Sequence, residues 1–594
     1  ILYLVKFKDY LNELQRRHVV KAGVAYLVIA WLIVQVLSVM IPAFDLGQGF
    51  LKITIIILSI GFPIWLFIAW IYDFTPEGIK KTEDMVFDAK VSAKKNVRLN
   101  RVIIGALSIA LILLIVNQLR MAETMEKQVM TASMLPDFTS SIAVLAFDDM
   151  SPNKDQEYFS DGISEEILNH LTKYKELKVI SRTSSFAYKG KDVTINMIGE
   201  ELDVAYVLEG SVRKSGDTFR TTVQLIDTKD GTHLWSETFD RKIEDALFTQ
   251  DEIASLVAKR LKLTLLRENV RLRKVDPRAY EMYLNGRINL AFQTPKGIDV
   301  AEQYFLKSVE IDPLFAPAFA GLSGIWIVKK QLNMVSPELA DPKMEEYLAK
   351  AFELDSADAE VWRWQASKLA NTDFKWKASN NAMEKCLKLN PNFSEARAFY
   401  AHFLMIQNRW DEAWEQMNRA VELDPFSPLV QNFRGILLLH QGRYDEYLSI
   451  FEPLDISALG HTGLLISYSL TKQYDKAIEH LKRIIRTKGQ EDKNKIEEII
   501  KILDETYKST GFRAALNVTA EALGKISDSH HLWSGQIMLL YLMAENKEKV
   551  LYWLEKLYIR KNPNLPYYAI IGPLTKRYQN EPRYIEIMER INLR

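Results

Sequence analysis

The sequence predicts a multi-domain membrane protein with three transmembrane helices, an α+β domain and an all-α repeat solenoid, in that order. Three observations support this fold class. Long uncharged apolar runs occur only before residue 120. Short strand-like runs alternate with helical patterns over residues 140–265. Prolines and acidic residues then recur at regular intervals in a helical region over residues 277–594.

Residues 1–120 are predicted to form a membrane anchor. Three apolar runs cover residues 24–41, 53–72 and 102–119, and none contains a charged side chain. About 20 apolar residues are needed to cross the hydrocarbon core of a bilayer, so each run is a candidate transmembrane helix. Buried helices of a large soluble domain are the alternative, which the lack of amphipathic partner helices disfavours.

Basic residues beside these runs predict the orientation of the anchor. Five lysine and arginine residues precede the first run, and seven lie between the second and the third. The loop between the first two runs contains only Lys52, at its border. Because cytoplasmic loops carry an excess of lysine and arginine, the N-terminus is predicted to be cytoplasmic. An odd number of spans then places residues 120–594 on the other side of the membrane.

Composition excludes several classes of function. Lysine plus arginine and aspartate plus glutamate both total 76, so no net charge attracts nucleic acid, and none is predicted as a partner. The single cysteine, Cys386, excludes an intramolecular disulfide framework and a cysteine-rich zinc site. It is predicted to be a small buried residue.

Residues 140–265 are predicted to form the α+β domain, after a polar stalk at residues 121–139. The expected order is β-α-β-α-β-β-β-α. Turn residues such as Ser215-Gly216-Asp217 stand where hairpins are needed. The expected strands are residues 142–147, 177–181, 205–212, 219–226 and 232–239, and the expected helices include residues 193–202 and 246–265.

Two segments, SIAVLAFDDMSPNKDQEYFSDGISEEI and YVLEGSVRKSGDTFRTTVQLIDTKDGTHLWSETFDR, make this domain resemble the TolB-like amino-terminal domain of many bacterial membrane proteins. The segment FPIWLFIAWIYDFTPEGIKKT resembles the membrane module that often precedes it. The resemblance implies a non-enzymatic domain, joined to repeats and sometimes to a cytoplasmic adenylyl cyclase, kinase or DNA-binding domain. It implies a bacterial inner membrane location, with residues 120–594 periplasmic.

No group of residues predicts a catalytic, cofactor or metal site, and the chain is therefore predicted not to be an enzyme. His170 with Ser184 or Ser185 is a weak candidate for a base and a nucleophile, because no G-x-S-x-G motif accompanies them. Five carboxylates at the start of the α+β domain do not match the spacing of a calcium loop. They are Asp148, Asp149, Asp155, Glu157 and Asp161.

Residues 277–594 are predicted to form a tetratricopeptide repeat (TPR) array with a C-terminal cap. The intervals from Ser356 to Pro391 and from Pro391 to Pro425 are 35 and 34 residues, which is the TPR period. Small residues let paired helices approach and large ones fill the groove between them. The predicted repeat-packing residues are Ala301, Phe305, Ala401, Leu404, Trp410, Ala413, Met417, Ala420 and Ala477.

Such an array presents a concave surface that binds peptides or proteins. Trp362, Trp364 and Trp376 are candidates either to line it or to pack in the core. The predicted function is an inner-membrane-anchored periplasmic scaffold or adaptor for other envelope proteins, with the lipid bilayer as a second partner and homo-oligomerisation left open. The alternative is the periplasmic sensing part of a transmembrane receptor whose output domain lies upstream of Ile1 or in a partner.

Overall fold

The computed structural model describes most of residues 140–594 and parts of the first 81 residues. After residue 140 the gaps are residues 175, 243–244, 262–274, 292–293, 333, 455–457, 490–492 and 528–532. Before it, residues 49–75 and 78–81 are described, with isolated positions between 22 and 37. The chain divides into two compact units, Ile1–Met130 and Thr131–Arg594.

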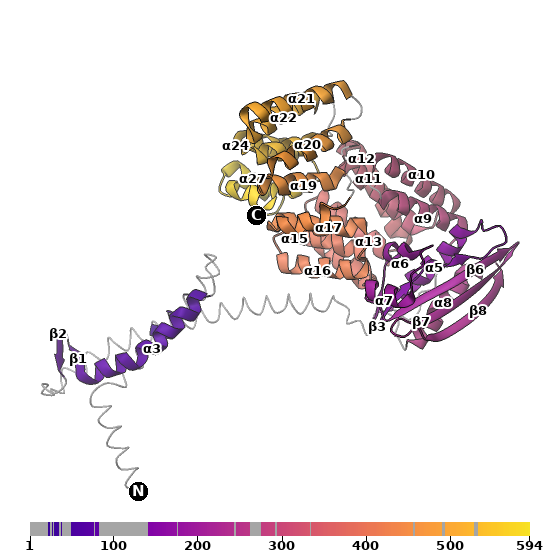
Figure 1. Ribbon diagram of the computed structural model, residues 1–594, viewed down its shortest axis with the longest axis horizontal. Coiled ribbons are helices and arrows are strands. Elements are labelled where there is room, and N and C mark those ends of the chain that lie inside the picture. The colour runs from indigo at the N-terminus through magenta and orange to yellow at the C-terminus, as the bar shows by residue number, and fades with distance from the viewer. Residues whose placement is uncertain are drawn as a thin grey trace, which may run out of the picture. The chain divides into compact units, whose positions relative to one another are not determined.

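The first unit contains one long helix followed by a β-hairpin. Helix α3 (Gly49–Ile71) leads into the antiparallel strands β1 (Tyr72–Thr75) and β2 (Gly78–Lys81) (Figure 1). Two hydrogen bonds join α3 to the apolar segment before it. The Tyr26 hydroxyl donates to the Leu58 carbonyl at 2.9 Å, and Trp65 Nε1 donates to the Ala22 carbonyl at 3.1 Å.

The predicted fold class is contradicted here. Within the described part of the chain, no helix has both the length and the continuous apolar character that a membrane crossing requires. The predicted span 53–72 falls on α3, whereas span 24–41 lies largely outside the described residues and span 102–119 lies wholly outside them. An uncharged run shows that side chains avoid water, but it does not show whether lipid or protein surrounds them. What the structure shows is an α+β region followed by all-α helices.

The α+β region is built on one mixed sheet. The sheet order is β5-β3-β6-β7-β8, with β4 paired to β6 outside this path. Strand β3 runs parallel to β5 and β6, whereas β6, β7 and β8 are antiparallel. The strands are β3 (Ser140–Val144), β4 (Asp148–Asp149), β5 (Leu177–Val179), β6 (Tyr206–Ser215), β7 (Thr218–Asp227) and β8 (His233–Lys242).

Helices cover both faces of this sheet. Helices α5 (Glu157–Leu171) and α8 (Ala246–Arg260) pack on one face and α7 (Ile195–Leu202) on the other. Because side chains alternate along a strand, Ile142 and Val144 of β3 join the α5–α8 core, whereas Ala143 joins the α7 core. The short helix α6 (Arg182–Ser185) follows β5 at the edge of the sheet.

The second part of this unit is a helical array in which consecutive helices pack in pairs (Figure 1). The first helices of successive pairs also contact one another, as α11, α13, α15 and α17 show. The helices of the first half are α9 (Pro277–Ala291), α10 (Pro295–Ile311), α11 (Ala316–Gln331), α12 (Pro337–Leu354), α13 (Ala359–Asn371), α14 (Trp376–Leu389), α15 (Ser394–Ile406), α16 (Trp410–Leu423), α17 (Pro428–Gln441) and α18 (Tyr444–Phe451).

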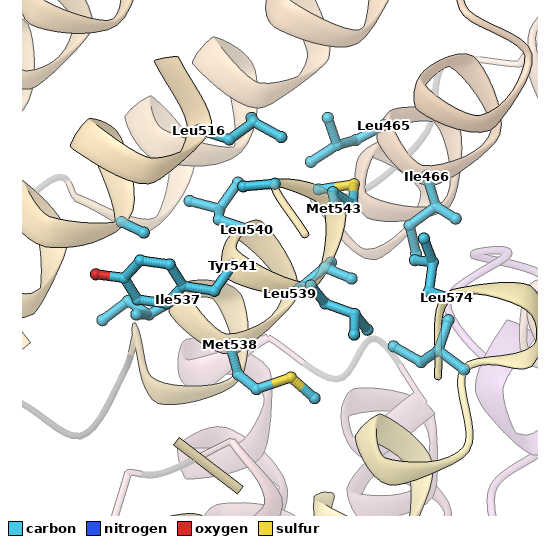
Figure 2. Close-up of a cluster of buried hydrophobic side chains, with 14 of the residues drawn as sticks. Leu465, Ile466, Leu516, Ile537, Met538, Leu539, Leu540, Tyr541, Met543 and Leu574 are labelled. Atoms are coloured by element: carbon cyan, nitrogen blue, oxygen red, sulfur yellow. The ribbon is translucent and has the colours of Figure 1, made fainter. Parts of the chain in front are cut away.

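The second half surrounds a helix that is buried on every side. All residues of α23 (Ser534–Met543) are buried, among them Leu540, which Figure 2 shows near Leu516 and Leu465. A helix that is apolar all round is stable only in a core. The other helices are α19 (Ala458–Leu470), α20 (Tyr474–Lys488), α21 (Lys493–Thr510), α22 (Phe512–Ser527), α24 (Lys547–Ile559), α25 (Leu565–Ala569), α26 (Gly572–Thr575) and α27 (Pro582–Arg590).

The C-terminal residues return to helices more than 200 positions earlier. Asn564 Nδ2 donates to the Gln331 carbonyl at 2.9 Å, at the end of α11. Trp376 Nε1 donates to the Ile591 carbonyl at 2.7 Å. Ile591 belongs to the predicted terminal cap, so the backbone of the cap has a hydrogen-bond partner in the middle of the array.

Loops of the array complete the edge of strand β5, which is last in the sheet order. The Asn392 side chain takes the place of a neighbouring strand. Its Oδ1 accepts from the Val179 amide at 3.0 Å, and its Nδ2 donates to the Leu177 carbonyl at 3.0 Å. The Ser181 amide donates to the Leu423 carbonyl at 2.8 Å. An unpaired strand edge leaves main-chain groups unsatisfied, so these bonds fix the α+β region to the array.

Candidate functional site

A cavity of about 2470 Å³ lies between the α+β region and the first helices of the repeats. We call it the central cavity. Its walls come from α5, α6 and α8 on one side, from α9, α13, α15 and α17 along its length, and from α23 and α25 near the C-terminal end. Small-molecule pockets measure roughly 300–1,000 Å³, so a cavity of this size fits a polypeptide segment.

The nine predicted repeat-packing residues are absent from the described lining of the central cavity. Eight of them are 0% exposed: Ala301, Phe305, Ala401, Leu404, Ala413, Met417, Ala420 and Ala477. Trp410 is half-buried at the start of α16, where its Nε1 donates to Asn408 Oδ1 at 2.8 Å. Cys386 is fully buried, and burial raises the pKa of its thiol.

Two adjacent carboxylates of α5 face the cavity from the α+β side. Glu165 lies 2.9 Å from Arg182 Nε of α6. Glu166 accepts hydrogen bonds from the Tyr280 hydroxyl of α9 and from Asn169 Nδ2, the latter at 3.0 Å. Burial raises the pKa of both carboxyl groups. The α+β region therefore contributes two buried carboxyl groups to a wall that it shares with the first repeat.

Helix α13 contributes a buried arginine to the middle of the cavity. The Arg363 guanidinium lies 3.7 Å above the Trp364 ring, and its Nη2 lies 3.3 Å from Glu360 Oε1. The same carboxylate accepts from the Tyr283 hydroxyl at 2.7 Å. Arg363 is only 4% exposed. A buried guanidinium needs both a counterion and hydrogen bonds, and Glu360 supplies only part of them.

Several buried donors on the cavity wall have no acceptor among the described residues. They are Arg363 Nε, Trp364 Nε1 and Ser367 Oγ of α13, and Gln536 Nε2 of α23. Nearly all buried polar groups in folded proteins are hydrogen-bonded, and leaving one unpaired costs about 1–3 kcal/mol. These donor atoms are covered by neighbouring atoms, and they belong to residues that line the cavity.

The structure does not bring together the base and nucleophile candidates. His170 Nδ1 pairs with Asp251 of α8 and lies 3.5 Å from Lys173 Nζ. Ser184 instead donates to Asp424 Oδ1 at 2.6 Å, and Ser185 to the Ile180 carbonyl at 3.3 Å. Burial lowers the pKa of His170 to about 3, which keeps its ring uncharged at neutral pH.

The candidate carboxylates at the start of the α+β region serve local structure. Asp149 accepts from the amides of Ser151 and Gln156 at 2.8 and 2.7 Å. Asp161 and Glu157 each lie 2.6 Å from Lys189 Nζ. In the part of the chain that the structure describes, no group of three or more histidine, cysteine, aspartate or glutamate side chains is placed to hold a metal ion.

An aromatic side chain of α25 closes the other end of the cavity. We call the segment 563–575, which contains α25 and α26, the C-terminal return. The Tyr567 ring of α25 lies 4.9 Å from the His440 ring of α17 and 6.0 Å from the His402 ring of α15. Burial lowers the pKa of these histidines to about 4 and about 3, respectively. This end of the cavity is therefore uncharged.

No local sequence signal predicts the cavity wall. Glu166, Arg363 and Gln536 come from α5, α13 and α23, and only the folded array brings them to one space. Of the three tryptophans considered, Trp364 lines the cavity, whereas Trp376 is buried and donates to the Ile591 carbonyl. Trp362 packs edge-on against Phe352 at 5.1 Å.

Two family models match this chain. Residues 138–256 match the second domain of HilA/YgeH-like transcriptional regulators. Residues 373–437 match the tetratricopeptide repeat. A curated relative from Rhizobium meliloti (strain 1021), named "Putative adenylate cyclase 3", is 43% identical over 205 residues. The match covers 33% of this chain, and the chain spans about a third (35%) of the length of that relative.

Solved structures show weaker likenesses. Yeast Tom70 has a TM-score of 0.31 at 15% identity over 58% of this chain and 76% of that chain. Pseudomonas aeruginosa pilF has a TM-score of 0.26 at 17% identity, over 36% of this chain and 93% of that one. TolB from Acinetobacter baumannii has a TM-score of 0.17 at 14% identity, over 21% and 29%. Likenesses this weak carry no argument, so the predicted TolB-like resemblance stays a prediction.

The prediction that the chain is not an enzyme is contradicted by its resemblance to a protein named as a cyclase. That prediction rested on the absence of a local catalytic motif. It also rested on the TolB-like resemblance, which implies a non-enzymatic domain. The predicted repeats, in contrast, are supported by the family model. The chain therefore contains tetratricopeptide repeats, which indicate a scaffold for protein–protein interaction.

Proposed function

We propose that this chain is a bacterial adaptor that holds a segment of another protein in the central cavity. We also propose that this partner is a protein of the cell envelope. The periplasmic location of residues 120–594 is likewise part of the proposal.

The observation that carries this proposal is the central cavity itself. Its volume of about 2470 Å³ suits a polypeptide, and buried donors on α13 and α23 have no acceptor among the described residues. The hydrogen bonds of Asn392 hold the α+β region over one end of the cavity. A rigid wall limits the entropy that is lost on binding, which favours a specific partner.

Site-specific photo-crosslinking tests this proposal in the full chain. Leu454 lines the central cavity and is 53% exposed, so a photo-reactive amino acid can replace it without disturbing a core. Tyr552 of α24 is 50% exposed and is not among the described lining residues, which makes it the matched control. We expect a crosslinked bacterial protein from position 454 and none from position 552. Crosslinks from position 552 alone would refute the proposal.

A second role is favoured by one specific observation, the resemblance to a protein named as an adenylate cyclase. We propose that the chain takes part in adenylate cyclase signalling, with the α+β region and repeats acting as the part that receives the partner. The cyclic AMP content of cells that lack the gene should then differ from that of complemented cells. Equal cyclic AMP contents under all growth conditions tested would rule this role out.

A further inference from the structure

We propose that the central cavity receives a basic segment of its protein partner, one that carries lysine or arginine side chains. This inference rests on the proposed function, because it names the chemistry of the segment that the adaptor holds. Two independent features of the cavity wall support it: an excess of carboxylates and a set of buried donors without acceptors.

Acidic side chains dominate the charge of the wall. Among the described lining residues, carboxylates outnumber lysine and arginine side chains nine to six. Two of the arginines are already engaged. Arg182 pairs with Glu165 at 2.9 Å, and Arg363 pairs with Glu360 at 3.3 Å. Outside these two pairs, seven carboxyl groups and four basic side chains remain on the described wall, so carboxyl groups are still in excess.

Glu166 and Glu395 are the carboxylates best placed to receive a cation. Glu166 accepts hydrogen bonds from the Tyr280 hydroxyl and the Asn169 amide, and the positive charges of Lys173 and Arg287 also act on its pKa. His170 Nε2 lies 3.9 Å from it, but the lowered pKa of that ring, about 3, leaves the histidine uncharged. Glu395 of α15 lines the same cavity and makes no ion pair within the described part of the chain.

Arg287 of α9 shows that this part of the cavity stabilises positive charge. Burial opposes the charge of its guanidinium. The Tyr283 hydroxyl and the Glu360 and Glu395 carboxylates outweigh that effect and raise the pKa of Arg287 above its ordinary value. Aromatic rings add to this stabilisation, since the Arg287 guanidinium lies 6.0 Å from the centre of the Tyr283 ring. A second cation brought by a ligand would meet these carboxylates together with the positive charge of Arg287.

The buried donors indicate that the ligand is a polypeptide. Ser367 Oγ and Gln536 Nε2 belong to side chains that are 1% and 3% exposed, and neither has an acceptor among the described residues. Main-chain carbonyl groups of an extended segment would supply acceptors, with basic side chains reaching the carboxylates. A polyamine has ammonium groups but no acceptor, so it would leave these donors unpaired.

Fluorescence anisotropy with labelled peptides tests the inference. The probe is an alternating lysine–alanine peptide of about 12 residues, which spans roughly 40 Å when extended. The comparison peptide replaces every lysine by glutamate, and spermine serves as a competitor. We expect the purified full chain to bind the basic peptide at least about tenfold more tightly than the acidic one, a difference of about 1.4 kcal/mol. Equal binding of the two peptides, or full displacement by equimolar spermine, would overturn the inference.

Matched variants locate the site. Glu166→Gln and Glu395→Gln keep the shape of each side chain and remove its charge, and each should weaken binding of the basic peptide about tenfold. Glu353→Gln is the control, because Glu353 is 68% exposed on α12 and is not among the described lining residues. Circular dichroism and unfolding midpoints must match the wild type for all three. Unchanged affinity in both cavity variants would contradict the assignment.

The pH dependence of binding gives a separate readout. Burial raises the pKa of Glu166, and a bound cation favours its ionised form, so binding releases protons. Affinity for the basic peptide should therefore rise as the pH rises through the raised pKa of Glu166. The Glu166→Gln variant should show a smaller rise.

Failure of this inference can be told apart from failure of the proposed function. If position 454 still crosslinks to a partner but the basic peptide does not bind, the cavity is a docking site of different chemistry. If neither result appears, the adaptor proposal fails with it.

Discussion

Asn392 joins the α+β region to the repeats through both ends of its side-chain amide. Its Oδ1 and Nδ2 satisfy the amide of Val179 and the carbonyl of Leu177. These main-chain groups are buried, and no neighbouring strand is available to them on that side of β5. One side chain therefore carries much of the contact that holds one wall of the central cavity in place.

Replacing Asn392 by alanine should destabilise this junction. The substitution leaves a buried donor and a buried acceptor unpaired, which costs about 1–3 kcal/mol each. We expect a lower thermal unfolding midpoint and faster proteolysis between the α+β region and the array. Asn196→Ala is the control, because Asn196 donates to the Lys229 carbonyl at 3.1 Å at an exposed site. Equal effects of the two substitutions would show that Asn392 has no special role.

Asp424 makes the same junction sensitive to pH. Burial, aided by the nearby charge of Glu395, raises the pKa of Asp424 to about 7 from an ordinary value of 3.8. A group with a raised folded-state pKa contributes stability that is complete below pH 3.8 and is lost as pH rises through about 7. Acidification from pH 8 to pH 5 should therefore stabilise the junction.

The Asp424→Asn variant isolates this effect. Asparagine cannot ionise, and its amide can keep a hydrogen bond to the Ser184 hydroxyl. The gain in unfolding midpoint between pH 8 and pH 5 should be smaller in the variant than in the wild type. Other buried carboxylates titrate in both proteins, so their contributions to the pH dependence of the unfolding midpoint cancel in the comparison. Identical pH profiles would contradict the raised pKa of Asp424.

At the scale of elements, the TPR helices were predictable from the sequence. The contacts of the C-terminal residues with helices in the middle of the array were not. The 34-residue spacing of prolines and the small residues Ala413 and Ala420 mark helix pairs, because both signals are local in sequence. The bond from Asn564 to Gln331 spans 233 positions and has no periodic signature. Likewise, nothing in the sequence of the three-residue strand β5 predicts that the Asn392 side chain will hydrogen-bond to its free edge.

Overpacking the helix pair α15–α16 should unfold the array locally. Ala413 and Ala420 are both 0% exposed, and a tryptophan at either position has no space. Overpacking costs about 1–3 kcal/mol, and coupling between neighbouring repeats spreads the damage. Limited proteolysis should show cleavage near α16. Asn418→Trp on the exposed side of the same helix is the control. Wild-type proteolysis of both alanine variants would mean that this helix pair tolerates the added volume.

Helix α25 should depend on the ring of Tyr567 and not on its hydroxyl. The ring packs against His402 and His440, and no hydrogen bond of the hydroxyl is found among the described residues. Tyr567→Ala should cost about 2–3 kcal/mol and loosen the C-terminal return, whereas Tyr567→Phe should be nearly neutral. Hydrogen exchange of residues 563–575 measures the difference. A destabilised Tyr567→Phe variant would assign the effect to the hydroxyl instead.

At the scale of the whole molecule, the central cavity is a product of assembly. Its wall combines Glu166 of the α+β region with Arg363 and Gln536 of distant helices, so no local motif could reveal it. The prediction from the apolar runs before residue 120 was wrong for a related physical reason. Hydropathy shows that a segment avoids water, but it does not show whether lipid or protein surrounds that segment. The regular repeats, in contrast, can be recognised in the sequence, because each repeat has similar residue types at equivalent packing positions.

A structure of the full chain with its crosslinked partner tests the central claim most directly. We expect an extended partner segment inside the central cavity, with carbonyl oxygens accepting from Ser367 Oγ and Gln536 Nε2 and with a basic side chain beside Glu166 or Glu395. A partner bound only to the outer helices, such as α12 or α24, with the cavity free of it, would contradict the account.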